Sequence, residues 1–272
     1  MAIRNHRVRI LNWPAFGGLI LASFRLFAAG QDAKLSARTE LSIAAAADLG
    51  FALDDLVKQF EQKNPAVKIN VTYGSSGNFF AQFQNGAPFD LFFSADVAYP
   101  RKLAEKGLGV DDVFLYATGR IVLWAPKNSP LDLDKLGIKV LLEPSVHKIA
   151  VANPEHAPYG RAAVSALKAL DVYNQVASRL VYGENIAQTA QFVQSGAADV
   201  GIVALSLAVS PQMRAAGRFW QVPPDAYPPL EQGGMILKSS KQVDTARAFR
   251  DFVLGDNGRK LLDQYGFSLP GK

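Results

Sequence analysis

Four short segments of small and polar residues each follow an apolar run and precede a helical pattern. A helix N-terminus presents N–H groups without intrahelical partners and about half a positive charge, so it attracts anions. In open α/β sheets, ligands bind beyond the carboxyl ends of the strands. If these junctions face one cleft, they form an anion site built from N–H and O–H dipoles. The junctions are AAAADLG at 44–50, YGSSGN at 73–78, NPEHAPYGRA at 153–162 and YGENIAQ at 182–188.

The second junction carries two neighbouring hydroxyls, Ser75 and Ser76, between Gly74 and Gly77. A serine before a helix often does no more than cap it, by accepting a hydrogen bond from a free N–H. A cap uses one hydroxyl and this junction has two, so one is left for a ligand. The interpretation depends on all four junctions facing the same space.

Catalytic motifs fit these residues poorly. The segment Gly74–Asn78 departs from the G-x-S-x-G nucleophile motif because its fifth residue is asparagine, and the chain contains no P-loop. A secreted serine hydrolase that uses Ser76 stays open as an alternative. Its base would have to be His147 or His156, because His6 lies in the N-terminal segment.

The composition is that of a folded soluble protein, with 49% hydrophobic and 19% charged residues in a chain of 272. The formal net charge of +5 depends on the N-terminus, where Arg4, Arg7, Arg9 and Arg25 occur without an acidic residue. Without these four arginines the Lys and Arg total falls from 29 to 25, against 24 acidic residues. Nucleic acid is therefore not expected as a partner. The absence of cysteine excludes disulfides and thiol catalysis.

Residues 1–30 resemble a secretory signal peptide. A basic start is followed by the apolar stretch FGGLILASFRLFAAG at 16–30, which ends in small residues and allows cleavage after Gly30. No later segment reaches the roughly 20 apolar residues that a membrane-spanning helix requires. We therefore expect a periplasmic protein, secreted through its N-terminal signal and, lacking cysteine, without a lipid anchor.

From Glu40 onward, strand patterns alternate with helical patterns, which predicts an α/β fold with mainly parallel sheets flanked by helices. Strands are expected at 41–47, 67–73, 90–95, 119–126, 148–153, 198–205 and 234–238. Helices are expected at 50–62, in a short segment with Phe80 and Phe83 facing inward, at 160–170, at 187–195 and from Val243 to a second turn around 261–262.

Two seams interrupt this alternation, one near 116–120 and one in the proline-rich segment QVPPDAYPPLEQGG at 221–234. Two seams in one chain suggest that one lobe is inserted into another. Lobe 1 is expected to comprise 40–120 and 223–272, and lobe 2 to comprise 121–222. The ligand cleft would lie between the lobes, which would close on a hinge at the seams.

Several motifs together resemble the periplasmic molybdate-binding proteins of ABC importers, which have the type II periplasmic binding fold. The resemblance extends over roughly 41–270. It rests on AAAADLGFAL, YGSSGNFFAQFQNGAPFDLFFSAD, IVLWAP, NPEHAPYG, GENIAQTAQFVQSGAADVGIVALS and YGFSLP.

The resemblance implies a tetrahedral oxyanion, molybdate and also tungstate, held between two lobes by backbone amides and hydroxyls. Carried over by position, the contacts come from Ala47, Asp48, Ser76, Tyr159 and Ile186, with no direct ligand to the metal atom. The resemblance also implies an importer permease and its ATPase as partners. A monomer without enzymatic activity and without a cofactor is expected.

This chain departs from the family pattern at two positions. Many relatives have a hydroxyl residue where Ala47 stands, and some have a ligand tyrosine where Ala204 stands. Tyr159 is therefore expected to form one wall of the cleft and to donate its N–H. The carboxylate of Asp48 would repel a dianion by several kcal/mol at low effective dielectric. Its side chain is expected to turn back and cap the 50–62 helix, leaving its N–H for the ligand.

Other solutes stay open as alternatives, namely sulfate, a phosphonate or a ferric ion. A ferric site would need tyrosines together with histidine or carboxylate, and the junctions supply Tyr159 and Tyr182. For an oxyanion, we expect dipoles rather than Arg or Lys to neutralise the charge. Discrimination against sulfate would then depend on the size of the cavity.

Overall fold

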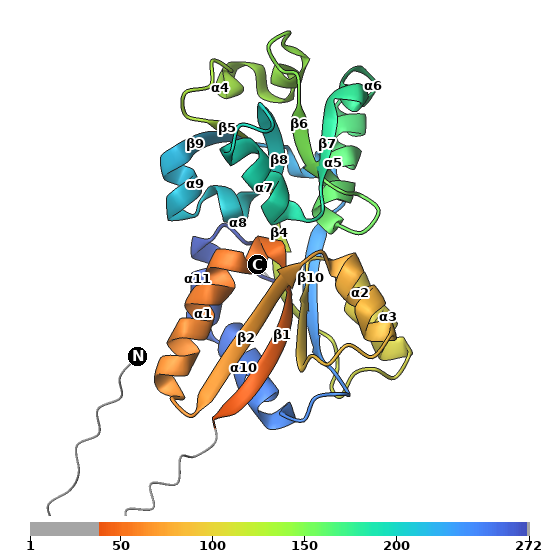
Figure 1. Cartoon of the computed structure of the whole chain (residues 1–272), viewed down its shortest axis with the longest axis vertical. Helices are drawn as coiled ribbons and strands as arrows, with labels where there is room; N and C mark the ends of the chain where they lie inside the picture. Colours follow the sequence, from red (N-terminus) through yellow and green to blue (C-terminus); the bar gives the residue numbers. More distant parts are fainter. Residues whose placement is uncertain (1–37, 271–272) are drawn as a thin grey trace, which may run out of the picture. The chain divides into compact units, whose positions relative to one another are not determined.

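A computed structural model describes residues 38–270, so the predicted signal peptide lies outside the described residues. The described chain forms two five-stranded sheets, with strand orders β2-β1-β3-β10-β4 and β7-β6-β8-β5-β9 (Figure 1). We call each sheet, with the helices packed on it, lobe 1 and lobe 2 respectively. The strands are β1 (Thr39–Ala46), β2 (Val67–Gly74), β3 (Leu91–Ser94), β4 (Phe114–Gly119), β5 (Ile121–Pro126), β6 (Ile149–Ala152), β7 (Leu180–Gly183), β8 (Val200–Ala204), β9 (Gly217–Gln221) and β10 (Leu230–Ile236).

The longer helices occur where apolar residues recur at helical spacing. The α-helices are α1 (Gly50–Lys63), α2 (Ser76–Gln84), α3 (Ala98–Glu105), α4 (Leu133–Leu136), α5 (Pro158–Ala169), α6 (Tyr173–Val176), α7 (Ile186–Gln194), α8 (Leu205–Ala208), α9 (Pro211–Ala216), α10 (Val243–Leu254) and α11 (Asp256–Gln264). Short 3₁₀ helices are η1 (Ala47–Leu49), η2 (Gly137–Leu142), η3 (Ala177–Arg179) and η4 (Pro224–Ala226). None of the helices described is both long and apolar enough to span a bilayer.

The two sheets are mixed, not mainly parallel as expected. β1 pairs in parallel with β2 and β3, and β6 with β7 and β8, whereas β10 and β5 pair antiparallel with both of their neighbours. The chain passes between the sheets at Arg120 and again through 222–229. A strand that returns from lobe 2 enters the first sheet at the end facing lobe 2, so β10 runs against β3 and β4. The residue boundaries predicted for the lobes stay predictions.

The seven predicted strands are all present, with shifted ends, but β4, β7 and β9 were not among them, and all three are edge strands. β9 reads GRFWQ and is only partly buried along its length, because it lies at the edge of the second sheet. β4 is likewise an edge strand, in the first sheet, and its first two residues are not buried. Edge strands bury less of their surface, so their sequences carry a weaker apolar pattern.

Lobe 1 has a separate apolar cluster on each face of its sheet. One cluster joins the sheet to α1, α10 and α11, and the other joins it to α2 and α3 (Figure 1). On α2 the buried rings are Phe79 and Phe83, whereas Phe80 is only partly buried and lies beside Tyr99. Phe80 thus packs at the margin of this cluster, and the buried Phe79 was not expected there. Residues four apart share a helix face more closely than residues three apart, and the sheet faces the Phe79 side.

Candidate anion-binding site

The four predicted junctions meet around one small cavity. β1, β2 and β7 end within the first, second and fourth junctions, whereas β6 ends directly before the third, whose loop leads into α5. The cavity is narrow, and the space inside it that is open to the centre of a water-sized sphere is about 10 Å³, close to what one water molecule needs. Both lobes contribute to its wall, and all five residues proposed from the sequence lie on it. The lining residues are Ala46, Ala47, Asp48, Gly74, Ser75, Ser76, Ala95, Ala157, Pro158, Tyr159, Asn185 and Ile186.

Three helices begin at residues that line this cavity. Ser76 and Ile186 are the first residues of α2 and α7, and Tyr159 follows the first residue of α5. The N–H groups at such positions have no partner inside the helix. On α7 the side chain of Asn185 accepts hydrogen bonds from Ala187 and Gln188, both at 3.0 Å, which leaves the N–H of Ile186 for another acceptor. The cap thus selects which N–H stays free.

Ser76 is fully buried and holds a turn in place. Its Oγ accepts a hydrogen bond from the N–H of Ala95 at 3.0 Å, and both residues line the cavity. Because the oxygen acts as acceptor in this bond, the hydroxyl hydrogen remains available to donate. This is the arrangement that an anion contact would require.

Asp48 does not cap the 50–62 helix, so that expectation was wrong. Its side chain instead reaches across the lobes. Oδ2 accepts hydrogen bonds from the Tyr159 hydroxyl at 2.9 Å and from Nε2 of Gln232 at 2.7 Å. The backbone carbonyl of Asp48 also accepts a bond from Oγ of Ser206, on α8 of lobe 2, at 2.8 Å. Asp48 therefore ties the first junction to lobe 2.

Burial raises the pKa of Asp48 to about 6, although hydrogen bonds from Gln232 and Tyr159 act in the opposite direction. The carboxyl group is 1% exposed and its second oxygen, Oδ1, has no hydrogen-bond partner. Desolvation of the charged form is the dominant effect, since a buried carboxylate loses its hydration. An acid with this pKa changes its protonation close to neutral pH.

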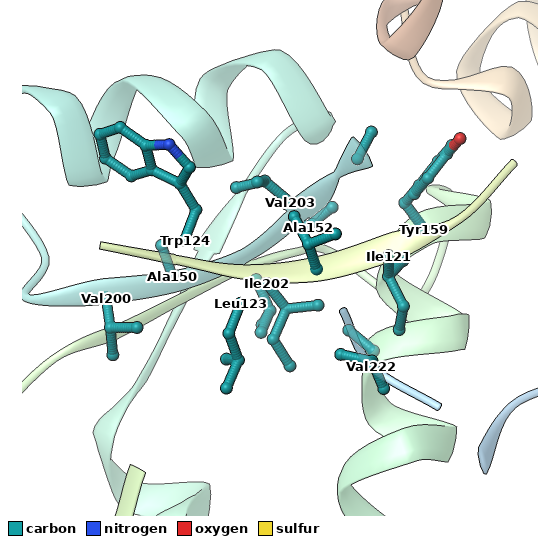
Figure 2. Close-up of a cluster of buried hydrophobic side chains, with 14 of the residues drawn as sticks. Ile121, Leu123, Trp124, Ala150, Ala152, Tyr159, Val200, Ile202, Val203 and Val222 are labelled. Carbon is teal, nitrogen blue, oxygen red and sulfur yellow. The ribbon is translucent and has the colours of Figure 1, made fainter. Parts of the chain in front are cut away.

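Tyr159 stands at the edge of the lobe 2 core with its ring among apolar side chains (Figure 2). Its hydroxyl oxygen points away from the other labelled residues of that cluster, as Figure 2 shows. Burial and the nearby Asp48 raise the pKa of Tyr159 well above its ordinary value. The phenol accordingly stays protonated and donates to Asp48. Its expected role as a wall and backbone donor stays a prediction.

Two alanines occupy positions where relatives were expected to carry ligand side chains. Ala47 is 3% exposed, lines the cavity and also packs in the apolar core. Ala204 is fully buried at the end of β8 and is not among the residues that line the cavity. The phenol of Tyr159 reaches Asp48 from the lobe 2 side.

Sequence reasoning missed several polar contacts between the lobes. Oγ of Ser75 lies 3.0 Å from Nδ1 of His156, and the N–H of Gly77 donates to the His156 carbonyl at 2.9 Å. Nδ2 of Asn78 donates to Glu184 at 2.5 Å. In the sequence, only Gly77 indicated a close contact here, because glycine permits another backbone to approach.

The serine hydrolase alternative paired Ser76 with a histidine, and that pairing is not present among the described residues. The Ser76 oxygen accepts from Ala95, and within residues 38–270 the histidine contact falls on Ser75 instead. His147, the other possible base, is exposed beside Asp199. Nε2 of His156 lies 3.6 Å from Glu184. Ser75 itself is 4% exposed.

One basic side chain belongs to the third junction, at Arg161. Its guanidinium forms an ion pair with Asp96 and a hydrogen bond with the Tyr99 hydroxyl, both in lobe 1. Arg161 lines a neighbouring groove rather than the cavity. Its charge is therefore neutralised by Asp96 and it acts between the lobes. Among the residues described, no cluster of three or more His, Asp or Glu could hold a metal ion.

The chain matches the family model described as bacterial extracellular solute-binding protein over residues 41–268. The molybdate-binding protein ModA of Azotobacter vinelandii is 38% identical over 231 residues, which cover 85% of this chain and 90% of that protein. ModA of Rhodobacter capsulatus is 35% identical over 200 residues, covering 73% and 77% respectively. The solved structure of the A. vinelandii periplasmic molybdate-binding protein matches with a TM-score of 0.79 at 32% identity, covering 85% of this chain and 99% of that chain. The chain therefore belongs to the family of bacterial extracellular solute-binding proteins.

Proposed function

We propose that this protein captures molybdate in the periplasm and delivers it to an ABC importer. The observation that carries the proposal is the meeting of four junctions, from both lobes, around one cavity. The names of the relatives, molybdate-binding proteins of 38% and 35% identity, support the same ligand. Tungstate, a dianion of the same shape, is included in the proposal.

In this proposal the anion is bound by the N–H groups at the starts of α2, α5 and α7 and by the Ser76 hydroxyl. Ala47 and Asp48 contribute from the first junction. Helix N-termini favour negative charge without a cation, and the effect is larger in a buried site than in water. Sulfate presents the same charge and the same pattern of acceptors. Rejection of sulfate would therefore come from the fit of the cavity around the larger anion.

An importer permease and its ATPase would receive the ligand-bound protein, which would act as a monomer and carry no cofactor. Export through the N-terminal signal would place it in the periplasm. The protein would perform no catalysis, and the pair of Ser75 and His156 would hold the lobes together rather than hydrolyse a substrate.

Thermal melting with added oxyanions tests the proposal. A ligand that binds only the folded state raises stability by about 2.7 kcal/mol at one hundred times its Kd. Molybdate and tungstate are expected to raise the melting temperature, and sulfate and phosphate to do so only at far higher concentration. Equal stabilisation by sulfate, or none by molybdate, would contradict the proposal. Incubation with a chromogenic ester, with Ser75→Ala as control, tests the hydrolase alternative.

A further inference from the structure

Two buried side-chain polar atoms in residues 38–270 have no hydrogen-bond partner, and one of them is Oδ1 of Asp48. The other, Nε1 of Trp124, is not on the cavity wall. Asp48 is 1% exposed and lines the cavity. Buried polar groups are nearly always hydrogen-bonded. We therefore expect a ligand in the cavity to supply the missing hydrogen bond to this carboxyl oxygen.

The other oxygen of the same carboxyl group is fully used. The Tyr159 hydroxyl donates to Oδ2, and so does Nε2 of Gln232. The orientation of Gln232 is fixed on its far side, because its Oε1 accepts from the Tyr116 hydroxyl at 2.8 Å. Two donors on Oδ2 leave Oδ1 as the atom on which a proton would reside.

We propose that Asp48 binds the oxyanion as a neutral carboxylic acid, with the hydroxyl on Oδ1 donating to an oxygen of the anion. One proton from solvent then joins Oδ1 for each dianion captured, and it is returned to solvent on release. This inference rests on the proposed function. It changes Asp48 from a group that repels the ligand into a donor that the ligand requires.

An ionised Asp48 would favour a different class of anion. An ionised Asp48 would repel a dianion that has only acceptors. It would instead accept a hydrogen bond from an anion that carries its own proton, such as hydrogen phosphate. The protonation of Asp48 therefore determines which class of oxyanion fits the cavity, and the two cases can be told apart by ligand choice.

The groups around Asp48 leave it as the principal acid of this site. Tyr116 and Tyr159 have pKa values well above the ordinary one through burial, so both stay neutral. The pKa of Asp48, raised by burial to about 6, permits protonation near neutral pH when a dianion adds its own field. α7 and α8 carry no charged residue.

Charged and titratable groups on the other neighbouring elements have partners of their own or lie at the surface. Asp54 on α1 accepts from Tyr73, and Arg161 on α5 pairs with Asp96. Glu231 on β10 is exposed. His156 contacts Ser75 and lies near Glu184. Histidine changes its charge between pH 5 and 8, so His156 needs a control.

Calorimetric titration of the full protein with molybdate between pH 6 and 9 tests the proposal. Affinity is expected to fall by up to about tenfold per pH unit in the upper part of this range. In two buffers of different ionisation enthalpy at pH 8, the titrations are expected to show uptake of close to one proton per anion. Affinity independent of pH together with no proton uptake would overturn the inference, and this measurement needs no variant.

Asp48→Asn supplies a second, independent measurement. The amide keeps an acceptor for Tyr159 and Gln232 and offers an N–H to the anion at every pH. It is expected to bind molybdate at least about tenfold more tightly than wild type at pH 8.5, with no pH dependence. His156→Gln is expected to keep the pH dependence of molybdate affinity seen in wild type. Loss of that pH dependence in His156→Gln, or its presence in Asp48→Asn, would contradict the assignment of the proton to Asp48.

Ligand choice separates this inference from the function on which it rests. Tight, pH-independent molybdate binding by wild type contradicts the proposed role of Asp48 but leaves the proposed function intact. Binding of phosphate in preference to molybdate indicates an ionised Asp48 and overturns the inference. If neither wild type nor Asp48→Asn binds molybdate at any pH, the proposed function itself is wrong.

Discussion

The N–H of Gly77 donates to the carbonyl of His156 at 2.9 Å, which joins the start of α2 in lobe 1 to the loop before α5 in lobe 2. A Cβ placed on Gly77 would lie 2.6 Å from that same carbonyl oxygen and 2.8 Å from the His156 Cα. The two backbones meet too closely for any side chain. Gly77 therefore sets how near the lobes can come.

Gly77→Ala is expected to weaken molybdate binding by about tenfold or more, roughly 1.4 kcal/mol, because the added methyl group holds the lobes apart. The melting temperature of the ligand-free protein is expected to change little, since each lobe keeps its own core. Gly50→Ala is a matched control, because nothing lies within 4 Å of a Cβ there. Unchanged calorimetric affinity in Gly77→Ala would show that binding does not need this contact.

Ser76→Ala is expected to weaken molybdate binding by about ten- to a hundredfold, the equivalent of one hydrogen bond to a charged group. The structure adds a second effect, because the buried N–H of Ala95 loses its acceptor. Stability is thus expected to fall by about 1–3 kcal/mol. Ser195→Ala, at the far end of α7, is the control for both measurements. An unaltered dissociation constant would remove Ser76 from the site.

Ala47→Ser is expected to tighten oxyanion binding by about 1 kcal/mol, because the new hydroxyl can donate to an anion oxygen. Ala47 both lines the cavity and packs in the core, so a competing outcome exists. A buried hydroxyl without a partner would lower the melting temperature and leave affinity unchanged. Titration and melting of this one variant distinguish the two outcomes, and the second would refute the placement of the first junction.

Asp48 is expected to make the stability of the ligand-free protein fall as pH rises from about 4 to about 6. Its pKa in the folded state is raised to about 6 from an ordinary value of 3.8. In that window the folded state holds more protons than the unfolded state, so raising the pH favours unfolding. The shift corresponds to about 3 kcal/mol.

Urea unfolding of wild type and Asp48→Asn from pH 4 to pH 7 checks this expectation. The difference between the two proteins isolates Asp48 from the other carboxyl groups. The variant is expected to gain stability relative to wild type as pH rises, and to reach a constant difference above about pH 7. A constant difference across the whole range would mean that burial does not shift this pKa.

The sequence by itself determined the local parts of this protein. Small residues after apolar runs, followed by helical spacing, located the four junctions, and Ser76, Tyr159 and Ile186 lie where helix starts were expected. These signals depend on residues close together in the chain. The buried Phe79 was missed even so, because which face of α2 meets the sheet depends on where the sheet lies.

The tertiary structure decided what the side chains at the junctions do. Asp48 meets Tyr159 across 111 residues of chain and Gln232 across 184. His156 meets Ser75 across 81 residues. A carboxylate beside a helix start could have capped that helix, but Tyr159 of lobe 2 and Gln232 on β10 of lobe 1 supply its donors instead. The direction of β10 follows from the same fact, since the chain re-enters the first sheet from lobe 2. Contacts of this kind depend on the order of strands and on lobe closure, which local residue patterns do not encode.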